Sequence, residues 1–148
     1  MNNYELTKKI ILSIMIPIII LLSSFAMTMI CLYQKDITIR FIASETCSIF
    51  INTLAYVYFN SCKSIYKLGL YDYEDELEDN DLKIALKALR VRRKDDIWLF
   101  AVIALINISA IIYAIILHKI VSIVLIAINI YLFYIMLKKF IEYVEISK

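Results

Sequence analysis

Glycine and proline are almost absent from this chain of 148 residues, in which Gly69 is the only glycine and Pro17 the only proline. Many transporters build their binding sites from membrane helices that glycine or proline interrupts, and this chain has little material for such a site. Helix contacts through a G-x-x-x-G motif are excluded for the same reason. Pro17 is expected to bend one helix and to do nothing more.

Catalytic and metal-binding groups are equally scarce. His118 is the only histidine, and no G-x-S-x-G, H-E-x-x-H or G-x-x-x-x-G-K-[ST] motif is present, which excludes most catalytic triads, zinc sites and phosphate-binding loops. The three cysteines form no C-x-x-C pair and give no disulfide framework. We therefore expect a protein that is not an enzyme and that binds neither a metal nor a cofactor.

Apolar sequence, in contrast, is abundant. Hydrophobic residues make up 62% of the chain, against ~45–50% in soluble domains. Two very short links, 34–36 and 118–119, separate apolar runs that approach or exceed the ~20 residues a helix needs to cross a membrane. The sequence thus predicts an all-α, polytopic membrane protein, a single domain over residues 1–148 with two helical hairpins. The four predicted spans are Ile10–Tyr33, Ile37–Phe59, Ile97–Leu117 and Ile120–Leu137.

The first run also has the outline of a cleavable signal peptide, with a basic start and the small-x-small triplet Ser24-Phe25-Ala26. Its apolar part continues for 24 residues, which is longer than the apolar region of a typical signal peptide. We therefore expect this run to be retained as the first span.

Lysine and arginine are distributed unevenly between the two ends of the predicted hairpins. Thirteen of them precede the first run, follow the fourth or lie in the segment 60–96, and three lie at the opposite end. Because basic residues are retained in the cytoplasm, both termini and the charged loop 60–96 are predicted to be cytoplasmic in a multi-pass protein of the cell membrane. Tyr33, Tyr58 and Trp98 are expected in the aromatic belts at the membrane surfaces.

The second run is the most polar of the four. Glu45, Ser48 and Asn52 fall on one side of a helix, and Glu45 is the one acidic residue well inside any predicted span. Asn107 and Asn129 fall near the middle of the third and fourth runs. Unpaired polar groups in hydrocarbon cost several kcal/mol, so these side chains should face protein or water. The five residues form a candidate intramembrane polar site.

This site has two interpretations. In the first, the asparagines make hydrogen bonds that hold the helices together, and Glu45 pairs with a cation near the outer surface, such as Arg40. In the second, Glu45 carries protons or binds a cation or a cationic ligand, because an ionisable residue inside the membrane is by default a functional one.

Charge is concentrated in the segment 71–96, where acidic residues come first and basic residues follow. The acidic part lacks the glycine and the spacing of a calcium-binding loop, and Asn80 or Asp81 is placed to cap a helix that begins near Leu82. This amphipathic helix either lies on an anionic leaflet or continues into the third span. Its basic residues are candidates for membrane-surface or partner contact: Lys83, Lys87, Arg90, Arg92, Arg93 and Lys94.

These features favour a non-enzymatic accessory, regulatory or immunity-type membrane subunit that acts through its helix faces and its charged loop. The alternative is a small oligomeric channel or transporter in which Glu45 and the asparagines line a path for a proton, a cation or a small cationic solute. The expected partners are the lipid bilayer, including anionic lipids, and either further copies of the chain or a larger membrane protein. The net charge of +2 belongs to membrane-flanking segments, so no nucleic-acid partner is expected.

Overall fold

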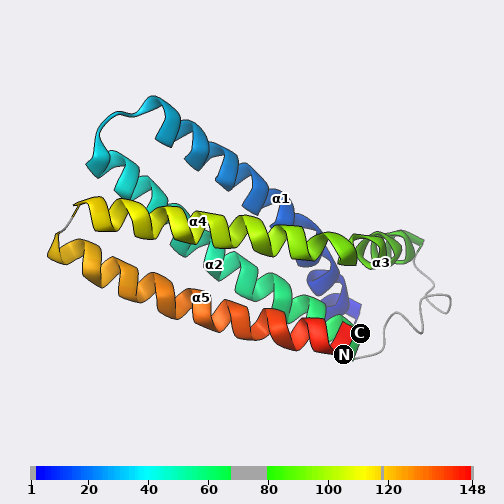
Figure 1. The fold of residues 1–148 in the computed structure, drawn as a ribbon. Coiled ribbons are helices and arrows are strands. Elements are labelled where there is room, and N and C mark those ends of the chain that lie inside the picture. Colours follow the sequence, from blue (N-terminus) through cyan, green and yellow to red (C-terminus); the bar gives the residue numbers. More distant parts are fainter. Residues whose placement is uncertain (1–2, 68–79, 118, 148) are drawn as a thin grey trace.

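The computed structural model describes residues 3–67, 80–117 and 119–147, and these residues are almost entirely helical (Figure 1). The prediction of an all-α protein is confirmed for this part of the chain. A shorter helix, α3 (Asn80–Arg92), and a 3₁₀ turn, η2 (Arg93–Asp95), precede the third long helix. The long helices are α1 (Asn3–Tyr33), α2 (Ile37–Lys67), α4 (Asp96–Leu117) and α5 (Ile120–Ser147).

Two tight connections join the long helices in pairs, and at these ends the helices begin and end where the apolar runs do (Figure 1). The first connection contains a helix cap, because the backbone N–H of Thr38 donates to Oδ1 of Asp36 at 2.9 Å. In the second connection the N–H of Ser122 donates to the carbonyl of Lys119 at 3.0 Å, which starts α5. His118 and the acidic residues over 71–79 lie outside the described residues.

At the opposite end the helices continue beyond the apolar runs. Beyond the predicted spans, α2 extends by about two turns and α5 by nearly three turns into charged sequence. There the ammonium group of Lys63 on α2 lies 2.6 Å from Oε2 of Glu142 on α5, and Lys139 lies 3.6 Å from the same oxygen. The charged helix ends are thus paired with one another across the bundle.

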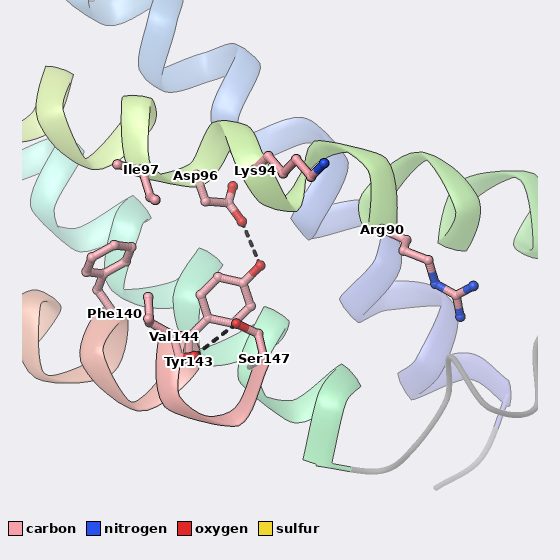
Figure 2. A pocket seen from close by; sticks show the side chains of 8 residues that line it. All are labelled: Arg90, Lys94, Asp96, Ile97, Phe140, Tyr143, Val144 and Ser147. Atoms are coloured by element: carbon pink, nitrogen blue, oxygen red, sulfur yellow. Dashed lines mark hydrogen bonds between the residues drawn. The ribbon is translucent and has the colours of Figure 1, made fainter.

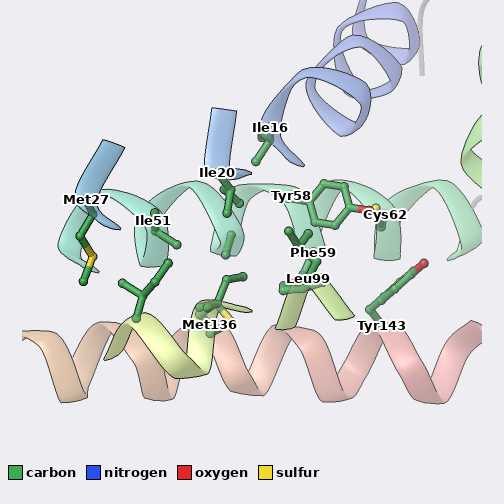
Figure 3. Close-up of a cluster of buried hydrophobic side chains, with 13 residues drawn as sticks. Ile16, Ile20, Met27, Ile51, Tyr58, Phe59, Cys62, Leu99, Met136 and Tyr143 are labelled. Atoms are coloured by element: carbon green, nitrogen blue, oxygen red, sulfur yellow. The ribbon is translucent and has the colours of Figure 1, made fainter. Parts of the chain in front are cut away.

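The most polar of the four long helices, α2, occupies the centre of the bundle and packs against α1, α4 and α5. A core of buried apolar side chains extends along it, with Ile51 and Phe59 from α2 fully buried. Ile20 of α1, Leu99 of α4 and Met136 of α5 face this core (Figure 3). The position of α2 explains its composition, since its polar side chains face other helices.

Three of the long helices are long and apolar enough to cross a membrane: Thr7–Tyr33, Asp96–Leu117 and Ile120–Ser147. Their outer faces expose large apolar side chains, including Leu22, Phe25 and Ile116, each more than half exposed. Apolar faces of this extent are costly in water and suit contact with lipid. The chain is therefore a multi-pass helical membrane protein.

Helix α3 is docked by its apolar side. Leu86 is fully buried and Leu89 is 6% exposed, and they form one buried cluster with Ile10 of α1 and Ile65 of α2. In Figure 1, α3 extends α4 beyond the end of the bundle. Of the two arrangements that the sequence left open, α3 adopts the one in which it continues into the next long helix. The side that carries Leu86 and Leu89 is covered by protein, whereas Ile84 and Val91 are exposed.

Candidate functional site

The five residues of the candidate intramembrane site come together in the structure. Glu45, Ser48 and Asn52 lie one turn apart on the inner side of α2, and Asn107 of α4 and Asn129 of α5 meet them there. None of the five is more than 8% exposed. We refer to these five residues as the polar layer.

Asn52 joins the three helices of the polar layer. Its amide nitrogen donates to Oδ1 of Asn107 at 2.9 Å and to Oδ1 of Asn129 at 3.0 Å, and its own oxygen accepts from the amide of Asn107 at 3.0 Å. Ser48 donates a further bond to Oδ1 of Asn107 at 2.9 Å. The second amide hydrogen of Asn107 is bonded to the carbonyl of Ile103. The amide groups of Asn52 and Asn107 are thus fully used within the bundle.

Glu45 lies at the edge of the layer that faces the two tight connections. Its Oε2 accepts a 2.7 Å hydrogen bond from the amide of Asn129. Its Oε1 is buried without a hydrogen-bond partner among the described residues, as is the hydroxyl of Ser122 on α5. The expected pairing of Glu45 with a surface cation is wrong: Glu45 is 2% exposed, and Arg40 donates instead to the carbonyl of Gln34.

The polar layer lies near the middle of the bundle. Asn107 is 11 residues from the first residue of α4 and 10 from the last. Asn129 is nine residues into α5, which is about 13 Å along a helix axis and close to half of the ~30 Å hydrocarbon thickness. Between this layer and the α3 end, aromatic rings fill the interior: Phe140 lies 4.9 Å from Phe59 and 4.4 Å from Phe100 between ring centroids.

A second buried polar group lies at the α3 end of the bundle, and sequence reasoning missed it. Asp96, the first residue of α4, is 4% exposed and accepts hydrogen bonds from the hydroxyls of Tyr58 on α2 and Tyr143 on α5, the latter at 2.7 Å. We call these three residues the carboxyl–tyrosine cluster. The expectation that Tyr58 lies in an aromatic belt is wrong, because Tyr58 is 1% exposed.

A weak signal for this cluster is present in the sequence. Tyr58 falls on the same half of α2 as Ser48, ten residues earlier, and Asp96 directly precedes an apolar run. By sequence Asp96 belongs to the charged loop 60–96, which is predicted to be cytoplasmic. Tyr143 lies beyond the predicted fourth span, Ile120–Leu137, so the sequence does not place it inside the bundle.

The basic residues of α3 and η2 separate into groups. Lys87, Arg90 and Lys94 are exposed and Lys83 is half-buried, whereas the side chains of Arg92 and Arg93 lie outside the described part of the chain. Arg90 and Lys94 line a cavity of about 520 Å³ between the start of α4 and the last turns of α5 (Figure 2). The structure therefore places two of the six basic candidates at a cavity.

Among the described residues, no three His, Cys, Asp or Glu side chains are grouped as a metal site would require. The fold and the buried side chains thus define the class of protein: it is a helical multi-pass membrane protein whose buried polar groups mostly hydrogen-bond to one another. No protein-family model, curated protein or solved structure matches the chain.

Proposed function

We propose that all four long helices cross the membrane as two hairpins with both termini in the cytoplasm. Helix α2 is less apolar than the other three, and its central position supports this proposal, because a helix surrounded by protein can carry polar groups through a membrane. The excess of basic residues at the α3 end supports the orientation. In this arrangement α3 is cytoplasmic, and the polar layer lies near the bilayer midplane.

Labelling of single cysteines in intact cells tests this topology, in a variant without the three native cysteines. A cysteine at Lys35 should react with an impermeant reagent added outside, and one at Lys87 should react only after permeabilisation. If both react from the same side, α2 does not cross the membrane. If their accessibility is reversed, the orientation is inverted.

We propose further that the protein is a non-enzymatic accessory or regulatory membrane subunit, of which an immunity protein would be one kind. The observation that carries this proposal is the internal pairing of the polar layer. Asn52 and Asn107 bond to each other, Asn52 also bonds to Asn129, and Asn107 bonds to the carbonyl of Ile103. The rings of Phe59 and Phe140 pack 4.9 Å apart between this layer and the α3 end. The surfaces left for recognition are the apolar helix faces and the exposed basic side of α3.

Charge reversal on α3 tests this proposal. A Lys83→Glu/Lys87→Glu variant should lose the membrane partner or second copy that co-purifies with the wild type after cross-linking in cells. Lys138→Glu, at an exposed position of α5, is the matched control and should retain it. Unchanged co-purification by the α3 variant would count against recognition through this helix.

One observation favours a second candidate, a small proton or cation channel or transporter. Oε1 of Glu45 is buried without a hydrogen-bond partner in the described structure, and a buried carboxyl oxygen of this kind is a possible binding point for a proton or a cation. The hydroxyl of Ser122, on α5, also has no hydrogen-bond partner among the residues that the structure describes. Ion flux that depends on Glu45 would establish this candidate.

A further inference from the structure

The cavity between α4 and α5 has two chemically different sides. Arg90 and Lys94, one helical turn apart before α4, line it with positive charge, and Ile97, Phe140 and Val144 line it with apolar surface. In Figure 2 the basic side chains lie toward α3, and the apolar ones lie toward the body of the bundle. The cavity is thus amphipathic along the long axis of the molecule.

Asp96 and Ser147, which also line the cavity, are hydrogen-bonded within the protein. The carboxyl group of Asp96 accepts a hydrogen bond from the hydroxyl of Tyr143, as Figure 2 shows, and another from the hydroxyl of Tyr58. The hydroxyl of Ser147 donates to the carbonyl of Val144 at 3.1 Å. Asp96 is 4% exposed, so its charge is turned toward the tyrosines, whereas Lys94 is exposed at the cavity. A ligand entering from the α3 end therefore meets cations first and apolar side chains next.

The cavity also lies where the apolar part of the bundle ends. Ile97 is 66% exposed and is the first residue of the apolar run of α4, and the charged sequence of η2 directly precedes that helix. In a membrane this boundary coincides with the headgroup region, where a phosphate and the first part of an acyl chain follow one another along the membrane normal. A soluble anion would use only the basic side of the cavity.

We propose that this cavity binds one anionic phospholipid, with its phosphate at Arg90 and Lys94 and its acyl chain against Ile97, Phe140 and Val144. The inference rests on the proposed four-span topology, which places the cavity in the cytoplasmic leaflet, where anionic lipids attract basic residues. It is independent of any protein partner on α3.

Native mass spectrometry of the full-length protein tests the proposal, with equal amounts of phosphatidylglycerol and phosphatidylcholine added in detergent. The wild type should retain one phosphatidylglycerol in preference to phosphatidylcholine. Arg90→Gln/Lys94→Gln should weaken this retention by about fivefold for each cation removed. Lys83→Gln/Lys87→Gln removes the same charge from the same helix outside the cavity and should leave retention unchanged.

A second variant addresses the apolar side without changing charge. Val144→Phe should fill this part of the cavity and reduce retention, and excess inorganic phosphate should not displace the lipid from the wild type. Equal retention of the two lipids, an equal loss from both pairs of lysine and arginine substitutions, or displacement by phosphate would each overturn the proposal. Since this measurement uses purified protein, its failure is distinguishable from a failed co-purification or an altered cysteine-labelling pattern.

Discussion

Two buried carboxyl groups in this bundle are held in different ways. Glu45 lies at the edge of the polar layer, eight residues after the first residue of α2, and one of its two oxygens is bonded to Asn129. Asp96 lies at the first residue of α4, and its two oxygens accept hydroxyl groups from α2 and α5. Both carboxyl oxygens of Asp96 are thus hydrogen-bonded to other helices, whereas Glu45 has one bonded oxygen among the described residues.

The difference indicates different roles. The carboxyl–tyrosine cluster fastens the start of α4 to two other helices where the bundle meets the charged segment. In the polar layer the asparagines make most of the connections between helices, and Glu45 contributes a single bond at the edge. We therefore expect Asn52 to contribute more to the stability of the bundle than Glu45 does.

The largest effect is expected at Asn52. Asn52→Leu keeps a similar volume but removes three interhelical hydrogen bonds, and with them the partner of Oδ1 of Asn129 and of one amide hydrogen of Asn107. At ~0.6–2 kcal/mol for each such bond, the free energy of unfolding should fall by about 2–3 kcal/mol. Denaturant titration in mixed micelles measures this change.

Thr53→Val is the matched control for this substitution. Thr53 is the next residue of α2, is exposed, and bonds only to the carbonyl of Ile49 in its own helix among the contacts of the described chain. Its substitution should change stability by less than about 0.5 kcal/mol. If both variants are equally stable, the polar layer does not hold the helices together.

A smaller effect is expected in the carboxyl–tyrosine cluster. Tyr143→Phe removes one hydroxyl, and Asp96 keeps its bond from Tyr58, so the loss should be about 1 kcal/mol. Tyr131→Phe, at a position of α5 that is 64% exposed, should be neutral in the same titration. In a double-mutant cycle, Tyr143→Phe and Asp96→Asn together should lower the free energy of unfolding by less than the sum of their separate effects. Full additivity would mean that the two side chains do not interact.

The smallest effect on stability is expected at Glu45. Glu45→Gln retains an oxygen that can accept the amide of Asn129, so the single bond of this side chain survives. The change in unfolding free energy should stay within about 0.5 kcal/mol. A loss as large as that of Asn52→Leu would mean that the carboxyl group is a principal connection of the polar layer.

The sequence predicts the helical class and the helix ends at the two tight connections, because apolar runs separated by two or three polar residues leave little choice. It does not predict how far α2 and α5 continue, since their last turns are charged and resemble a loop in composition. Pairing between Lys63 and Glu142 stabilises those turns, and a contact between residues so far apart in the chain is not visible in a single sequence.

The polar layer was predictable for a similar reason. Five polar side chains near the middle of apolar runs are expected to face one another, because an unpaired polar group in contact with lipid is costly. Asp96 differs because an acidic residue at the end of a charged segment is normally solvated. Its burial depends on the alignment of α4 with α2 and α5, which the sequence alone does not define. The same holds for α3, whose apolar side was evident although the protein surface that covers it was not.

The central claim is that the polar layer joins the helices and does not conduct, and ion flux through reconstituted vesicles tests it most directly. Vesicles with the wild-type protein and vesicles with Glu45→Gln should both pass protons and alkali cations at the rate of protein-free vesicles, because the interior polar groups bind one another. Flux through the wild type that Glu45→Gln abolishes would contradict this claim and establish a path through Glu45.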